Sequence, residues 1–115
     1  MWEIEYYERE DGTCPVKEFI LSLDVKQRAK AARQIDLLEE KGTELREPHV
    51  KHFSGPLWEL RSRFANDIQR IFYFAPDGDT FVLLHGFVKT TQKTPPKEAA
   101  KAQKNYEDYQ RRAAQ

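Results

Sequence analysis

Residues 57–74, with the sequence LWELRSRFANDIQRIFYF, constrain the fold more than any other part of the chain. In the first half of this segment apolar and charged residues alternate, and this period of two predicts a strand that is apolar on one side and charged on the other. A polar break at 65–67 is followed by Ile68 to Phe74, a nearly continuous run of aromatic and β-branched residues. The segment therefore predicts two β-strands joined by a turn.

Three arginines of this hairpin predict a basic surface. Arg61 and Arg63 fall on the charged side of the first strand, and Arg70 is the one charged residue within the apolar run. A cation inside a sheet is costly, so Arg70 must have a partner or face an opening. Guanidinium groups donate hydrogen bonds in a fork that matches phosphate, and three of them together would form a surface suited to that group.

The length and the cysteine content favour a small intracellular protein. The 115 residues predict one domain, spanning residues 1–115. Cys14 is the only cysteine, which excludes an intramolecular disulfide and a thiolate zinc site and favours a reducing location. The N-terminus does not resemble a signal peptide, and no window approaches the roughly 18 apolar residues of a membrane span. We therefore expect a cytoplasmic protein with no membrane partner.

The charges balance overall but are unevenly distributed. The 19 basic and 19 acidic residues give no net charge, which removes the simplest argument for nucleic-acid binding. Residues 1–11 are strongly acidic, whereas residues 89–104 contain five lysines against Glu98. This distribution predicts a dipolar molecule.

The order of the remaining elements predicts an α+β fold. The alternating start of the chain predicts a strand, and Pro15 begins a short helix that ends near Leu23. Asp24 caps a longer helix from Val25 to Lys41 that Gly42 ends. A connection from Gly42 to Leu57 precedes the hairpin, and residues 80–88 predict a central strand. A terminal helix begins at Pro95, after a capping Thr94.

These elements predict a small, twisted, antiparallel-dominated β-sheet with the helices packed on one face. Two of the helices precede the hairpin and the third ends the chain. The other face of the sheet is expected to stay open.

Metal or nucleophile chemistry has little support in the sequence. His49 and His52 lie three residues apart in the expected connection, His85 lies inside an apolar strand, and no acidic residue is spaced with them as a ligand motif. We interpret His85 as a core or second-layer histidine. No serine has a nucleophile-elbow context and no glycine-rich phosphate loop occurs, so we expect neither a metal nor a cofactor.

The basic residues of the sheet are the remaining candidates for chemistry. They are Arg61, Arg63, Arg70, Lys89 and Lys93. Metal-free cleavage of an RNA phosphodiester needs a base for the 2′-hydroxyl proton, donors for the phosphorane oxygens and a proton for the leaving 5′-oxygen. Arginine supplies the donors, and a lysine can exchange protons if nearby cations or desolvation lower its pKa. The same residues also fit a plain solubilising surface, and spacing alone does not separate these interpretations.

Several motifs resemble one known family. LWELRSRF, QRIFYF and LLHGFVKTTQKTP before a terminal helix resemble the RelE/HigB superfamily of bacterial type II toxins, in particular the HigB-like branch that includes phage-derived proteins. The opening WEIEYY and the pattern G-x-x-P-V-x-E-F are similar to that branch as well. The resemblance implies the RelE/ParE-like toxin fold over nearly the whole chain.

The resemblance also implies an activity and partners. It implies a toxin that a cognate antitoxin, encoded next to it and carrying a helix-turn-helix region, holds inactive. On the ribosome such a toxin is an mRNA interferase, an endoribonuclease that cleaves mRNA without metal and leaves a 2′,3′-cyclic phosphate. By this resemblance Arg61, Arg70, Lys89 and, as a second choice, Lys93 are expected to be catalytic and Arg63 to bind substrate. Lys51 and His52 are expected to bind substrate because the connection places them beside the hairpin.

Two departures from the family pattern leave alternatives open. Glu59 stands where RelE-type relatives carry a second lysine, and no tyrosine follows the last strand at the family's spacing. His52, Lys51 or Lys93 are candidates for the missing proton-transfer group. A ParE-type protein that poisons DNA gyrase, or a catalytically degenerate protein that only binds its partner, are the alternative functions.

Overall fold

The computed structural model describes residues 2–89 and 93–115 of the chain. It contains three α-helices, one short 3-10 helix and five strands within these residues. In chain order they are β1 (Glu3–Tyr6), α1 (Pro15–Ser22), α2 (Val25–Lys41), η1 (Gly42–Glu44), β2 (Val50–Ser54), β3 (Leu57–Phe64), β4 (Asp67–Phe74), β5 (Thr80–Lys89) and α3 (Pro96–Ala113). The class is α+β, as the sequence predicts.

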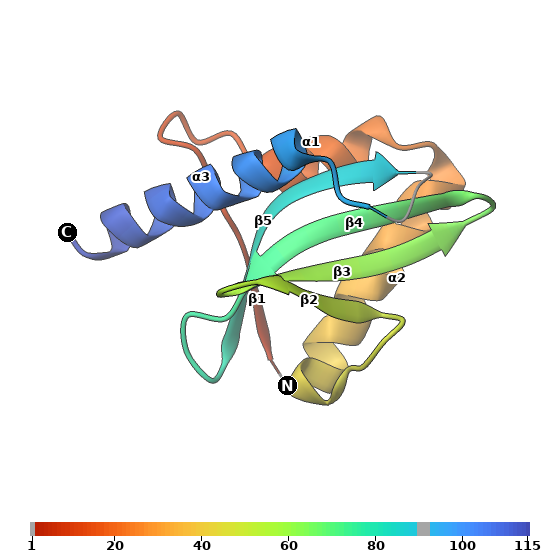
Figure 1. The fold of residues 1–115 in the computed structure, drawn as a ribbon, viewed down its shortest axis with the longest axis horizontal. Coiled ribbons are helices and arrows are strands. Elements are labelled where there is room, and N and C mark those ends of the chain that lie inside the picture. The colour runs from red at the N-terminus through yellow and green to blue at the C-terminus, as the bar shows by residue number, and fades with distance from the viewer. Residues whose placement is uncertain (1, 90–92) are drawn as a thin grey trace.

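The five strands form one mixed sheet in the order β1-β5-β4-β3-β2 (Figure 1). The neighbours from β5 to β2 are all antiparallel, whereas β1 pairs with β5 in parallel. The sheet is therefore antiparallel-dominated. The predicted hairpin of residues 57–74 is confirmed and contains the central strand β4.

The ends of α2 follow directly from its sequence. The carboxylate of Asp24 accepts a hydrogen bond of 2.8 Å from the backbone N–H of Gln27, the N-terminal cap that the sequence predicts. Gly42 ends the helix with a φ of 57°, in the region that only glycine adopts readily. A Cβ at Gly42 would also lie 2.0 Å from the ring of Trp2, so this position admits no larger residue without movement.

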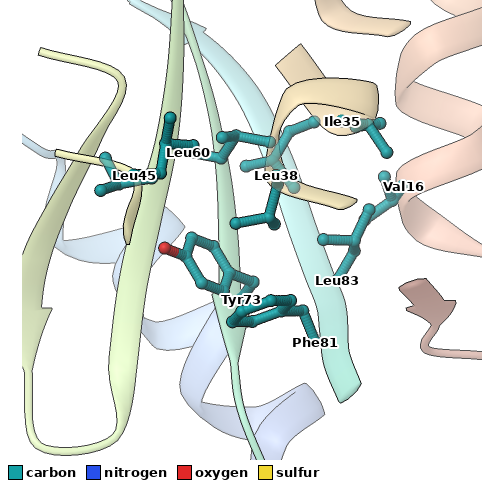
Figure 2. Packing of buried hydrophobic residues seen from close by; sticks show 10 residues of the cluster. Val16, Ile35, Leu38, Leu45, Leu60, Tyr73, Phe81 and Leu83 are labelled. Atoms are coloured by element: carbon teal, nitrogen blue, oxygen red, sulfur yellow. The ribbon is translucent and has the colours of Figure 1, made fainter. Parts of the chain in front are cut away.

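One face of the sheet packs against α1 and α2. Buried residues of both helices meet buried residues of β3, β4 and β5 there (Figure 2). Figure 2 labels Val16, Ile35, Leu38, Leu45, Leu60, Tyr73, Phe81 and Leu83. The absence of a side chain at Gly86 lets the Phe19 ring of α1 lie against β5, because a Cβ there would be 2.4 Å from that ring. This core fixes the sheet from one side.

The terminal helix α3 covers the opposite face, contrary to the expectation that all helices share one face. Its residues Ala102, Tyr106 and Tyr109 pack against a second core that includes Phe72 and Phe74. Figure 1 shows α3 along the β5 side of the sheet. The face predicted to stay open is therefore covered over β5 and β4. A helix with one apolar side must bury that side, but the spacing within it does not say against which face.

The sequence predicts only a connection between Gly42 and Leu57, but the structure also contains the short edge strand β2 there. Val50 pairs with Leu60, and Lys51 pairs with Glu59. Only Val50 of this strand is buried. Five residues with one buried side chain carry little apolar periodicity, which is why the pattern does not predict a strand here.

No helix within residues 2–89 and 93–115 has both the length and the apolar character that crossing a bilayer requires.

Candidate functional site

Two arginines lie directly opposite each other on neighbouring strands of the sheet. Arg61 of β3 pairs with Arg70 of β4, two steps along from the pair of Glu59 and Phe72. These side chains lie on the sheet face that α3 partly covers, because Phe72 belongs to the core beneath that helix. Like charges opposite each other in a sheet repel, so this pair requires a counter-charge.

The carboxylate of Glu59 supplies that counter-charge. Its Oε1 atom lies 3.2 Å from Nη2 of Arg61 and 3.6 Å from Nη1 of Arg70. Its Oε2 atom accepts a hydrogen bond of 2.8 Å from the hydroxyl of Thr94, which in turn accepts one of 2.9 Å from Nη1 of Arg70. We call Glu59, Arg61, Arg70 and Thr94 the Glu59 cluster. Buried charges are tolerated when they are paired and hydrogen-bonded in this way.

The members of the cluster differ in how far solvent reaches them. Arg70 and Glu59 are 1% and 2% exposed, whereas the side chain of Arg61 is 18% exposed. The Nε atom of Arg61 is buried and has no hydrogen-bond partner among the described residues. Because this Nε atom is buried, an incoming anion would meet Arg61 through the exposed part of its side chain. Arg61 is therefore the arginine of the cluster best placed to meet an incoming anion.

Lys89 lies beside the cluster at the end of β5. It pairs with Ile68, which in turn pairs with Arg63, and it makes no ion pair with any described residue. Desolvation and then the charge of Arg70 lower the pKa of Lys89, Glu59 opposes this effect and Lys93 adds to it. A lysine with a lowered pKa exchanges protons more readily near neutral pH.

Arg70 is too deeply buried to contact a substrate directly. The resemblance implies a catalytic Arg70, but the structure buries its side chain against Glu59 and Thr94. In this arrangement Arg70 orients the carboxylate and the hydroxyl, and contact with solvent is left to Arg61. Strand β4 is buried on both of its faces, so no opening to solvent lies beside Arg70. The residue pattern of a strand does not reveal whether both of its faces are covered.

The remaining predicted site residues are only partly brought together. Lys51 stands opposite Glu59 in the register, and Lys93 is exposed but close enough to influence Lys89. Arg63 is exposed further along β3 and lines a separate groove. His52 lies outside the cluster, although it pairs with Trp58 and so stays beside the hairpin.

The position of His52 follows from strand geometry. Lys51 and His52 are consecutive residues of β2, and consecutive side chains point to opposite faces of a sheet. The ring of His52 packs edge-on against Trp58 at 5.0 Å, and its Nε2 atom lies 2.8 Å from the carbonyl oxygen of Gly55. His52 borders a hollow of about 650 Å³ whose floor includes Leu45, Val50 and Tyr73, on the side of the sheet that packs against α1 and α2. This hollow therefore does not adjoin the Glu59 cluster.

Sequence reasoning misses the roles of Glu59 and Thr94. Glu59 lies two residues before Arg61, which places both on one face of a strand, and this spacing is the available signal for an ion pair. The sequence predicts Thr94 as the cap of the terminal helix, but the helix cap is Pro95 and the hydroxyl of Thr94 contacts Glu59 and Arg70 instead. No local pattern predicts that contact, because 35 residues separate Thr94 from Glu59.

His85 forms a second polar pair on the same face. Its Nε2 atom lies 2.7 Å from Oε1 of Glu98, and its ring stacks on Phe87. His85 and Glu59 flank Phe72 on opposite sides in the register, so they are roughly 10 Å apart at the usual strand spacing. The pair fits the interpretation of His85 as a second-layer histidine and does not join the cluster.

Residues 2–89 and 93–115 contain no group of three or more histidine, cysteine or acidic side chains arranged to hold a metal ion. The chemistry available at the Glu59 cluster is that of cations around an anion. Two guanidinium groups pair with one carboxylate, and Lys89 is close enough to feel the charges of Arg70 and Glu59, which leaves excess positive charge.

The comparisons with known proteins give one family. The model of the family described as "Phage derived protein Gp49-like (DUF891)" matches residues 18–107, well over half of the chain. The matched region contains β2 to β5 and with them Glu59, Arg61, Arg70 and Thr94. No curated protein matches the sequence.

Proposed function

The chain belongs to the Gp49-like family of phage-derived proteins, and on this premise we propose that it is the toxin of a bacterial type II toxin–antitoxin system. The proposed activity is cleavage of mRNA on the ribosome, as the resemblance to the RelE/HigB superfamily implies. The resemblance rests on LWELRSRF, QRIFYF and LLHGFVK, which are β3, most of β4 and most of β5. An activity of this kind would act in the cytoplasm.

The observation that carries the proposal is the meeting of Arg61 and Arg70 at one carboxylate oxygen. A point that two guanidinium groups approach within 3.2 and 3.6 Å is an anion site, and Glu59 holds an oxygen there. Phosphate oxygens and carboxylate oxygens make the same kind of hydrogen bond to arginine. The site thus has the electrostatics that a phosphodiester requires.

The proposed reaction divides the work between Arg61 and Lys89. The 2′-hydroxyl gives its proton to solvent water as its oxygen bonds to phosphorus, while the bond from phosphorus to the 5′-oxygen breaks, which gives a 2′,3′-cyclic phosphate and a 5′-hydroxyl. Arg61 stabilises the charge that develops on the phosphorane oxygens. Lys89, with its lowered pKa, gives a proton to the leaving 5′-oxygen. Arg70 and Glu59 are positioning residues, because they are buried behind Arg61.

The same burial favours a second candidate function, a binding-only homologue. Glu59 already occupies the anion site and Arg70 is 1% exposed, so a phosphate would have to bind beside the carboxylate or displace it. A protein that only bound its antitoxin would have no need for an accessible anion site. The measurement of cleavage separates the two functions.

The test is cleavage of mRNA on purified ribosomes, read by primer extension. The wild-type protein should cut mRNA only when it is being translated. Arg61→Ala should lower the cleavage rate by about 10²- to 10³-fold, the usual effect of losing one donor to a developing oxyanion. Lys104→Ala, an exposed lysine of α3 outside the cluster, is the matched control and should cleave as wild type.

Three results would overturn the proposal. An absence of cleavage together with gyrase-linked DNA breaks would favour the ParE-type alternative, and an absence of both would favour the binding-only function. Equal cleavage by the wild type and Arg61→Ala would remove the anion site from the mechanism.

The proposed partner is a cognate antitoxin encoded beside this chain. The proposal predicts that induction of the protein arrests growth and that co-expression of the adjacent reading frame restores it. Restoration by an unrelated reading frame would contradict a specific antitoxin.

A further inference from the structure

A second basic surface lies at the side of β3 that faces α2. It is a groove of about 370 Å³ with walls from α2, from the segment before β2 and from the end of β3. Its charged lining residues are Lys30, Arg33, Arg61 and Arg63. Neither the family match nor the Glu59 cluster accounts for this groove.

The charged residues that line the groove are all basic. Among the described residues no aspartate or glutamate lines it, whereas Lys30, Arg33, Arg61 and Arg63 do. Lys30, Arg33 and Arg63 are exposed and form no ion pair with a described residue. Cations gathered without carboxylates repel each other and attract counter-ions, so an anion is the ligand that such a groove favours.

Three buried or partly buried hydrogen bonds hold the walls of the groove in place. The Gln34 side chain of α2 donates to the backbone carbonyl of Arg61. The hydroxyl of Ser62 donates to Gln69 over 2.9 Å, and the Gln69 amide donates over 3.0 Å to the carbonyl of Gln27. These bonds connect α2 to β3 and β4, so the cations of the helix and of the strand keep a fixed separation.

We propose that this groove binds phosphate groups of RNA outside the scissile position. The inference rests on the proposed function, and β3 connects the two sites because Arg61 belongs to both the Glu59 cluster and the groove. An RNA strand held in the groove would lead its next nucleotides toward Lys89 and Arg61. Arginine suits this task because its planar fork binds phosphate oxygens in pairs.

The lining favours RNA over an acidic protein partner. Protein interfaces depend on aromatic and large apolar anchors, and the lining of the groove includes no Phe, Tyr or Trp and only Ile68 and Pro48 as apolar residues. Recognition there must therefore come from charge and hydrogen bonds. Backbone recognition of RNA has this character and is sensitive to salt.

The test is binding of a labelled single-stranded RNA oligonucleotide to the full chain, by fluorescence anisotropy over a series of KCl concentrations. Lys30→Ala combined with Arg33→Ala should weaken binding about fivefold or more at low salt. The slope of log affinity against log salt should become shallower by about 0.7 for each phosphate that the variant no longer neutralises. Arg63→Ala alone should give a smaller change in the same direction.

The controls separate this inference from the proposed cleavage. Lys41→Ala, at the other end of α2 and outside the groove, should bind RNA as wild type. Lys89→Ala should lose cleavage but keep the groove-dependent part of RNA binding. Wild-type affinity and salt slope in the groove variants would overturn the inference while leaving the cleavage proposal intact. Equal displacement of the RNA by polyglutamate of matched charge would overturn it as well, in favour of an acidic polypeptide.

Discussion

Arg61 and Arg70 lie directly opposite each other on β3 and β4, and both approach the same oxygen of Glu59. A cross-strand pair of like charges is unfavourable unless an anion lies between the two. The sheet therefore holds a buried carboxylate between two of its cations. This arrangement links the stability of the sheet to the chemistry proposed for its surface.

Removal of the Glu59 carboxylate should strongly destabilise the protein. Glu59→Ala takes away the carboxylate that pairs with Arg70, which is 1% exposed, and breaking a buried ion pair in this way typically costs about 3–5 kcal/mol. Urea denaturation measures the loss of unfolding free energy. Glu40→Ala, at an exposed position of α2, should change it by no more than about 0.5 kcal/mol. Similar values for both variants would contradict the role of Glu59 as the counter-charge.

Activity should decline on the alkaline side through Lys89. A general acid works in its protonated form. Activity is therefore present below the pKa that Lys89 has in the folded protein, and it is lost as the pH rises through that pKa. Because desolvation and Arg70 lower the pKa of Lys89, this loss should begin below 10.5. Lys89→Arg keeps the positive charge, but an arginine does not release its proton in this pH range. The variant should therefore cleave more slowly than the wild type, and its rate should not fall as the pH rises. Single-turnover cleavage rates from neutral to alkaline pH provide the measurement, and an unchanged decline in Lys89→Arg would refute the assignment.

Asp108 should stabilise the fold near neutral pH and lose this contribution in strong acid. The hydroxyl of Tyr7 donates a hydrogen bond of 2.6 Å to Asp108, and together with Arg112 it lowers the pKa of this carboxyl below 3.8 in spite of some desolvation. A carboxyl group whose pKa is lower in the folded protein than in the unfolded chain stabilises the fold at a pH above the unfolded-state pKa. This contribution is lost as the pH falls through the folded-state pKa. The urea midpoints of the wild type and Asp108→Asn should therefore differ most above about pH 4 and converge in stronger acid. Asp36→Asn is the exposed control, and a gap that widened in acid would contradict the prediction.

A methyl group at Gly86 should disturb the first core. The Cβ of Gly86→Ala would lie 2.4 Å from the ring of Phe19, so α1 would have to move away from β5. Overpacking of this kind typically costs about 1–3 kcal/mol. Gly78→Ala, which meets nothing within 4 Å, is the matched control. Thermal unfolding compares the two variants, and equal midpoints would show that α1 packs more loosely against β5 than the Phe19 contact requires.

The sequence predicts those features that depend on neighbouring residues. Asp24 and Gly42 mark both ends of α2 because capping is a local interaction. The alternation after Leu57 and the apolar run before Phe74 mark β3 and β4 because one or both faces of each strand are buried. The short edge strand β2 carries too little of this pattern to be recognised.

The features that the sequence does not predict depend on contacts between distant residues. The face on which α3 packs is decided by which part of the sheet presents aromatic residues such as Phe72 and Phe74. Not all basic residues of the candidate site lie close together. Consecutive side chains of β2 point to opposite faces of the sheet, so His52 points away from Lys51. The burial of Arg70 depends on Thr94, which approaches it from beyond the end of β5.

The proposed cleavage is tested most directly by the chemical identity of the RNA ends produced on translating ribosomes. We predict that the wild-type protein leaves 2′,3′-cyclic phosphate and 5′-hydroxyl ends, and that Arg61→Ala forms them about 10²- to 10³-fold more slowly. Intact mRNA, or ends with a free 3′-hydroxyl, would contradict the proposed reaction.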